Sequence, residues 1–147
     1  MLKNKINEDL KKAMLARDEQ TTTALRGLKG AILDVEVAEG KREAGLTDAE
    51  IEKILQREVK KRKESLEIYK TNGRDELAEA ERAEITILEN YLPKQMTDEE
   101  LSEVIDKVVK NAGDDVNVGK VIGAVKAEVG SQADGGRIAK LVQEKLK

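Results

Sequence analysis

The densest run of chemically useful side chains in the 147-residue sequence is QREVKKRKES, residues 56–65. Four consecutive cations stand at its centre: Lys60, Lys61, Arg62 and Lys63. Cations along one helix can contact successive phosphates of a nucleic acid. The same run can equally be a solvent-exposed helix face, in which Lys60 and Lys63 pair with Glu64 and Glu67 one turn later.

Arg62 differs from the other three cations because it falls in the apolar stripe of the predicted helix. Lysine and arginine can extend their charged ends to solvent along an apolar stem. We therefore expect the Arg62 guanidinium either to reach solvent in this way or to meet a carboxylate of a neighbouring helix.

A second concentration of positive charge lies in residues 116–147, which carry six bases against three acids. The bases are Lys120, Lys126, Arg137, Lys140, Lys145 and Lys147. In the same region, Gly119 and Gly123 stand four residues apart in a strong helix pattern, where each costs about 1 kcal/mol relative to alanine. These glycines predict either a closely packed neighbouring helix or a bare backbone surface that brings an RNA backbone or a partner helix near Lys126.

The stretch ADGGR, residues 133–137, has the glycines of an anion-binding loop but also an acid. Asp134 would repel an anion at the start of the following helix. An aspartate at this position instead favours an N-cap that accepts a hydrogen bond from the amide of Gly136 or Arg137. We expect Asp134 and Gly135 to form a tight turn, with anion contacts made by the flanking Lys120, Arg137 and Lys140.

Residues suited to catalysis are scarce. The chain has no cysteine and no histidine, which excludes thiolate chemistry and removes the commonest general base and metal ligand. Its three serines lack the flanking residues of a nucleophile elbow, and no phosphate-binding glycine motif follows a strand. The acids lie mainly in the first turns of helices or at helical spacing from bases. We expect no catalytic residue, no metal and no cofactor.

Apolar periodicity is helical throughout, so the sequence predicts an all-α fold. One stripe has Leu2, Ile6, Leu10 and Met14 at four-residue spacing. Thr47 with Glu50, and Thr97 with Glu100, are capping boxes that begin helices, and Pro93 ends one. We predict two domains: residues 1–93, built around a long helical hairpin, and residues 94–147, a three-helix module.

The chain shows no signal-peptide pattern and no apolar run of about 18 residues. We therefore expect a soluble, cytoplasmic protein that does not enter a membrane. Its net charge of −3 is nearly balanced, which disfavours an extended nucleic-acid binder and leaves local basic patches as the candidates.

Five segments taken together resemble the GatB/YqeY family, and more closely a stand-alone YqeY-like protein. In order they are LRGLKGAI, QREVKKRKESLEIY, EITILENYLPKQMTDEEL, VGKVIGAV and ADGGRIAKLV. The resemblance spans nearly the whole chain. It implies an all-helical fold whose C-terminal part is similar to the GatB tail of the glutamyl/aspartyl-tRNA amidotransferase, where the tail engages tRNA.

What the resemblance implies about function is tRNA recognition. The matching positions are Gly119, Lys120, Gly123, Asp134, Gly135 and residues 60–63, whereas Gln132 replaces a residue that is often basic. The family is associated with glutamine-dependent amidation of mischarged tRNA, a carbon–nitrogen ligation. Without a self-contained active site, this chain is expected to contribute recognition, alone or with an amidotransferase or another protein. The alternative is a non-enzymatic protein-interaction adaptor.

Overall fold

The computed structural model describes residues 1–147, and every regular element in it is a helix. This confirms the predicted all-α fold. The chain forms two compact units, Met1–Leu92 and Pro93–Lys147, each with its own apolar core. None of the helices combines the length and the apolar character that a membrane span requires.

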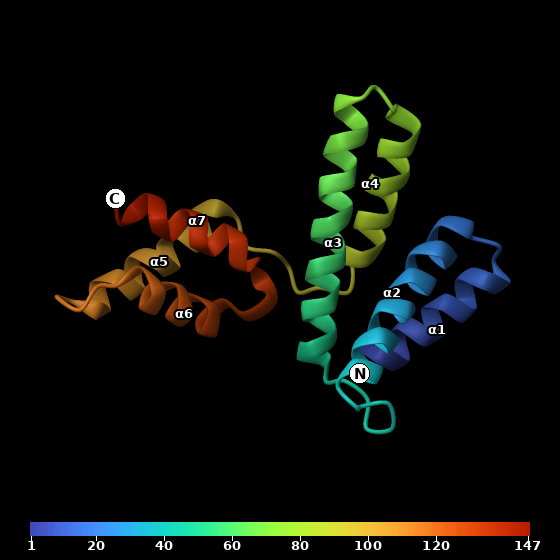
Figure 1. Cartoon of the computed structure of the whole chain (residues 1–147), viewed down its shortest axis with the longest axis horizontal. Coiled ribbons are helices and arrows are strands. Elements are labelled where there is room, and N and C mark those ends of the chain that lie inside the picture. Colours follow the sequence, from blue (N-terminus) through green and yellow to red (C-terminus); the bar gives the residue numbers. More distant parts are fainter. The chain divides into compact units, whose positions relative to one another are not determined.

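The first unit consists of four helices (Figure 1): α1 (Leu2–Leu15), α2 (Glu19–Ala38), α3 (Asp48–Thr71) and α4 (Asp75–Glu89). The long helices α3 and α4 lie side by side as a hairpin, and α2 packs against α1, α3 and α4. Aliphatic side chains build the core, and six of its members are less than 2% exposed: Ile6, Leu25, Leu28, Ile51, Leu55 and Leu88.

Local signals explain where α3 begins and ends. Thr47 Oγ1 accepts a 3.2 Å hydrogen bond from the Glu50 amide, and the Glu50 carboxylate accepts one from the Thr47 amide at 3.1 Å. This reciprocal capping box satisfies two amides that the helix start leaves unpaired. The helix ends just before Gly73, whose φ of +70° is unfavourable for residues with a side chain.

The second unit consists of α5 (Asp98–Ala112), α6 (Val118–Val129), a 3₁₀ turn (Gly130–Gln132) and α7 (Gly135–Lys145). Thr97 and Glu100 form the second capping box. The Gln95 side-chain amide donates to the Ser131 carbonyl at 2.9 Å, and the Met96 amide donates to the Gln132 carbonyl at 2.8 Å. These bonds fix the segment before α5 against the corner between α6 and α7.

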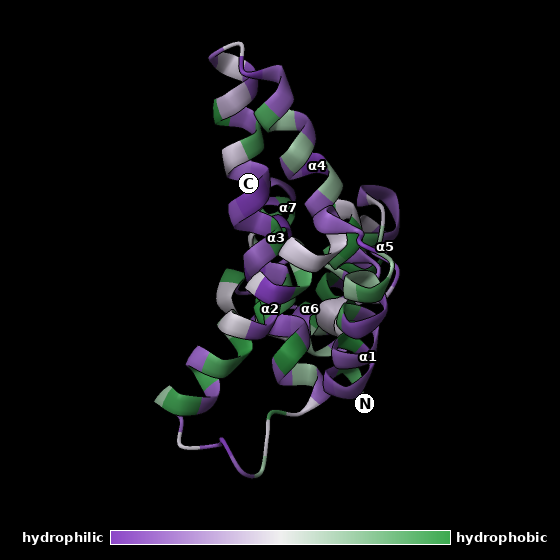
Figure 2. Ribbon diagram, turned by 90° about the vertical axis from the view of Figure 1, so that its right-hand side faces the viewer, coloured by the Kyte–Doolittle hydropathy of each residue, from purple (hydrophilic) through white to green (hydrophobic).

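Figure 2 shows hydrophobic and hydrophilic residues alternating along the helices, as expected of amphipathic segments that each bury one side. The predicted stripe on α1 is correct through Ile6 and Leu10 but wrong at Met14, which is 49% exposed. Positions four apart rotate by about 40° at each step, so the stripe drifts off the buried side. Ala13 is buried in place of Met14.

Candidate nucleic-acid interface

The basic run on α3 is less available to a ligand than its sequence suggests. Lys60, Lys61 and Lys63 are all exposed. Lys61 Nζ lies 3.3 Å from a Glu58 carboxylate oxygen of the same helix, and Lys63 Nζ lies 3.8 Å from one of Glu89 on α4. Lys60 makes no ion pair. The carboxylate partners therefore differ from those expected one turn later on α3.

Arg62 is held inside the first unit. Its guanidinium lies 2.8 Å from a Glu84 carboxylate oxygen and 3.7 Å from one of Glu81, both on α4. The arginine side chain is 22% exposed and that of Glu84 is 16% exposed. A Cβ at Gly27 of α2 would lie 3.4 Å from the same guanidinium. The expectation of a carboxylate on a neighbouring helix is confirmed, and Arg62 joins α2, α3 and α4.

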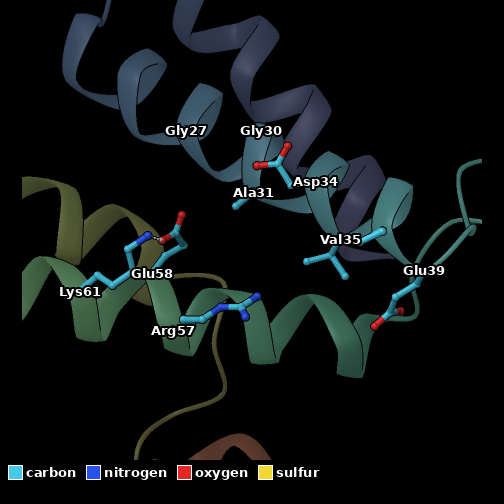
Figure 3. A pocket seen from close by; sticks show the side chains of 10 residues that line it. Gly27, Gly30, Ala31, Asp34, Val35, Glu39, Arg57, Glu58 and Lys61 are labelled. Carbon is cyan, nitrogen blue, oxygen red and sulfur yellow. Dashed lines mark ion pairs between the residues drawn. The ribbon is translucent and has the colours of Figure 1, made fainter.

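A groove between α2 and α3 is lined by Gly27, the residue that approaches the Arg62 guanidinium (Figure 3). Its volume is about 660 Å³. One wall is formed by α2 and the other by α3; the charged residues are Asp34, Glu39, Arg57, Glu58 and Lys61. The walls thus carry three acids and two bases, which gives the groove a mixed rather than a basic character.

The α3 surface also presents two cations that are not among the predicted RNA contacts. Lys53 and Arg57 are exposed and make no ion pair. Together with Lys60 they follow the spacing i, i+4, i+7, which keeps them on one side of the helix. That spacing is readable from the sequence, but the adjacent run of four cations is the more conspicuous signal.

The two glycines of α6 are solvent-exposed. A Cβ built at Gly123 meets no atom within 4 Å, and one built at Gly119 meets only the side chain of Asn117, which caps the same helix at the Lys120 amide. Neither glycine therefore accommodates another helix of its own unit. Of the two explanations that the sequence left open, the bare backbone surface is the one that fits this geometry.

The predicted turn before α7 is present in detail. Asp134 accepts a 3.3 Å hydrogen bond from the Gly136 amide, which confirms it as the N-cap. Gly130, with a φ of +56°, ends α6. The Lys126 side chain lies across the start of α7, because a Cβ at Gly135 would be 3.2 Å from Lys126 Cε and 3.3 Å from its Nζ.

The remaining cations of this unit divide into paired and unpaired groups. The Arg137 guanidinium donates to the Met96 carbonyl at 2.9 Å and to Asp98 at 2.7 Å, so it ties α7 to the start of α5. Lys120 pairs with Asp115 at 3.0 Å, on an exposed surface. Lys126 and Lys140 are exposed and make no ion pair. A ligand therefore meets these two lysines without displacing an internal partner.

The perturbed pKa values belong to structural contacts. The Lys41 ammonium and the Thr47 amide hydrogen bond to Glu50 and lower its pKa to about 2. Burial, followed by a 2.6 Å hydrogen bond to Asp9, raises the pKa of Tyr91 above its ordinary value. No cluster of three acids has the arrangement of a metal site. The basic side chains of α3, α6 and α7 offer hydrogen bonds and positive charge to an anion.

Comparison with known proteins gives one family match that covers almost the whole chain. The family described as Yqey-like protein matches residues 3–146. Among curated proteins, Altered inheritance of mitochondria protein 41, mitochondrial, from Saccharomyces cerevisiae is 31% identical over 125 residues, which is 84% of this chain and 60% of that protein. The Lachancea thermotolerans protein of the same name is 38% identical over 88 residues, 59% of this chain and 46% of its own length.

The chain therefore spans about half of the length of these relatives. Their names place them in mitochondria, which contradicts the expected cytoplasmic location. The expectation relied on the lack of an apolar leader pattern and of apolar spans. These features do not distinguish a cytoplasmic protein from a mitochondrial one, because mitochondrial transit segments are amphipathic and not uniformly apolar.

Proposed function

The chain belongs to the YqeY-like protein family, and from this premise we propose that it is a helical tRNA-interacting module. The proposal extends to an auxiliary role in glutamine-dependent amidation of mischarged aminoacyl-tRNA, following the similarity of the C-terminal unit to the GatB tail of the amidotransferase. The chain's share in that process is recognition, because its surfaces offer hydrogen-bond donors and positive charge.

The exposed flank of α6 is the observation that carries the proposal. Gly123 lowers helix stability by about 1 kcal/mol relative to alanine and makes no contact that an added methyl group would disturb. A glycine of this kind allows a ligand backbone to approach the helix closely. Lys126 is less than one turn away and unpaired, so an approaching phosphate gains an ammonium partner.

Basic residues are concentrated in one part of the second unit's sequence, which supports an anionic ligand on α6 and α7. Helix α5 carries five acids against two bases, while residues 116–147 carry six bases against three acids. A nearly neutral unit can therefore attract a polyanion to one part of its sequence. Lys120, Arg137 and Lys145 already have carboxylate partners, so we assign the direct phosphate contacts to Lys126 and Lys140.

The test is a titration of the full chain with unfractionated tRNA at several salt concentrations, with mitochondrial tRNA as a second arm. Two or three phosphate contacts predict a slope of about −2 in the plot of log affinity against log salt. A Lys126→Gln/Lys140→Gln variant should bind at least tenfold more weakly. Lys110→Gln is the matched control, because Lys110 is an exposed lysine of the acidic helix α5 that makes no ion pair. No binding at about 50 mM salt, or binding that salt does not weaken, would refute tRNA interaction.

The alternative, a non-enzymatic protein-interaction adaptor, predicts a different outcome. A pull-down with this chain would then recover a specific protein after nuclease treatment, and recovery would not depend on RNA. The tRNA proposal predicts that nuclease treatment removes the co-purifying material.

A further inference from the structure

The outer face of α2 carries apolar side chains that the other helices of the first unit leave uncovered. Gly30, Leu33 and Val37 follow one another at spacings of three and four residues, which keeps them on one side of the helix. Leu33 is 42% exposed and Val37 is 59% exposed. The opposite side of α2 is buried in the core. A surface helix ordinarily has polar residues opposite its buried stripe, so this second apolar ridge needs its own explanation.

Gly30 has no packing role within the first unit. A Cβ built at this position meets no atom within 4 Å, and its backbone lies in the ordinary helix of α2. Gly30 lines two grooves, one of about 660 Å³ toward α3 and one of about 290 Å³ toward α1, and no side chain stands between them at this position. Figure 3 shows Gly30 at the edge of the larger groove. Another helix can therefore approach α2 closely at this position.

Two opposite charges flank the ridge, and neither makes an ion pair within its own chain. Lys29 lines the groove toward α1, and Asp34 lines the groove toward α3. In heptad notation, Gly30, Leu33 and Val37 occupy a, d and a, Lys29 is the preceding g, and Asp34 is the following e. In a parallel helix pair, a g residue meets the e residue of the next heptad on the other helix.

We propose that a second copy of this chain docks on this ridge, with the two α2 helices parallel about a two-fold axis. Leu33 and Val37 of each copy then pack on their equivalents, and Gly30 permits the close approach. The symmetry places Lys29 of each copy against Asp34 of the other, so the ion pair forms twice. The self-complementary charges are what select a second copy over an unrelated helix.

The ridge is short, and the interface is expected to be reversible. A standard stable interface buries about 800 Å² per partner, more than the outward side of one helix over two turns provides. We expect a dissociation constant between about 1 µM and 1 mM. The chain should therefore be monomeric in dilute solution and dimeric when concentrated.

Sedimentation equilibrium of the full chain from about 5 µM to 1 mM tests the docking surface. The apparent mass should rise from 16.3 kDa toward twice that value. Leu33→Asp should weaken association at least tenfold, because it puts a charge in each copy at the centre of the ridge. Leu77→Asp is the matched control, since Leu77 on α4 is 43% exposed. A mass of 16.3 kDa at every concentration, or a dimer insensitive to Leu33→Asp, overturns the proposal.

Charge exchange tests the parallel register. Lys29→Asp and Asp34→Lys should each weaken association severalfold, because each places like charges together. The double variant should recover affinity to within about twofold of the original chain, since the exchanged pair is again complementary. Circular dichroism melting checks that each variant stays folded. A double variant no tighter than the single variants overturns the parallel arrangement.

Discussion

Replacing Arg62 with methionine tests a three-residue charge cluster in the first unit whose side chains are all less than a quarter exposed. The substitution keeps much of the aliphatic stem but removes the charge between Glu81 and Glu84. The two carboxylates, which are 20% and 16% exposed, then lose the cation that lies near both of them. We expect the first unit to lose stability and the α3–α4 hairpin to be the part most affected.

The size of the loss follows from the degree of burial. Fully exposed ion pairs contribute about 0–1 kcal/mol, and removing one partner from a fully buried pair costs about 3–5 kcal/mol. Arg62 and Glu84 lie between these limits, so we expect Arg62→Met to lower the free energy of unfolding by about 2 kcal/mol. The buried Arg62 Nε has no hydrogen-bond partner, which keeps the expected value below the upper limit.

Urea unfolding followed by tyrosine fluorescence measures this loss in the intact chain. Both tyrosines, Tyr69 and Tyr91, lie in the first unit and there is no tryptophan, so the signal reports that unit alone. A cycle with Glu84→Gln isolates the pair: Arg62→Met/Glu84→Gln should be less destabilised than the sum of the single variants, by about 1 kcal/mol.

Two results would refute this reasoning. A loss below about 0.5 kcal/mol for Arg62→Met would mean that the cluster behaves as an ordinary surface pair. Additive effects of Arg62→Met and Glu84→Gln would mean that the 2.8 Å contact contributes no coupling. Lys61→Met is the matched control, because its contact with Glu58 lies within one helix and Lys61 is 68% exposed; it should change stability by less than about 0.5 kcal/mol.

Three further outcomes follow from local geometry. The pKa of Glu50 is depressed to about 2. The contribution of Glu50 to stability is therefore present above the ordinary pKa of 4.5 and is lost as the pH falls toward 2. An NMR titration of Lys41→Ala should show a higher pKa for Glu50 than in the original chain. The pKa of Tyr91 is raised, so the contribution of this residue to stability is present below its ordinary pKa of 10.0 and is lost as the pH rises through its pKa in the folded protein. In an alkaline titration followed by tyrosinate absorbance, Tyr91→Phe should remove the phase that appears at the highest pH. In the second unit, Gly123→Ala should stabilise by up to about 1 kcal/mol in thermal melts, whereas Gly130→Ala should destabilise by about 1–2 kcal/mol because its φ is +56°.

Features that depend on a few neighbouring residues were predictable from the sequence. Thr47 and Thr97 each have a glutamate three residues later, and both pairs form capping boxes in the structure. Asp134 could be recognised as an N-cap because the following glycines leave its side chain free to reach their amides. In each case the partners lie within one turn, so the chain itself brings them together.

The partners of the cations were not predictable in the same way. Arg62 pairs with Glu84, and Arg137 reaches Asp98 and the Met96 carbonyl, across turns and helices. Residue spacing within one helix says nothing about which carboxylate a neighbouring helix presents. The sequence could therefore indicate that Arg62 needed a partner. For Arg137 the sequence predicted an anion contact and did not indicate its bonds to the start of α5.

Gly30 and Gly123 show the same physical signature in two different units, yet their surroundings favour different ligands. Each sits in a helix at a cost of about 1 kcal/mol, and a Cβ at either position would meet no atom of its own unit within 4 Å. Gly30 is accompanied by two large exposed apolar side chains, Leu33 and Val37. Burying them against a protein partner is favourable, because it removes apolar surface from water. Gly123 is accompanied by the unpaired Lys126, whose ammonium group attracts an anion.

This difference predicts a crossed result. Gly123→Ala should weaken tRNA binding by about fivefold, the equivalent of one lost contact of about 1 kcal/mol, and leave self-association unchanged. Leu33→Asp should weaken self-association at least tenfold and leave the tRNA affinity of the dilute, monomeric chain unchanged. If Leu33→Asp instead weakened tRNA binding at concentrations where the original chain is monomeric, the apolar ridge of α2 would belong to the RNA surface. It would then be wrong to assign a protein partner to the Gly30 surface and an RNA ligand to the Gly123 surface from the side chains beside each glycine.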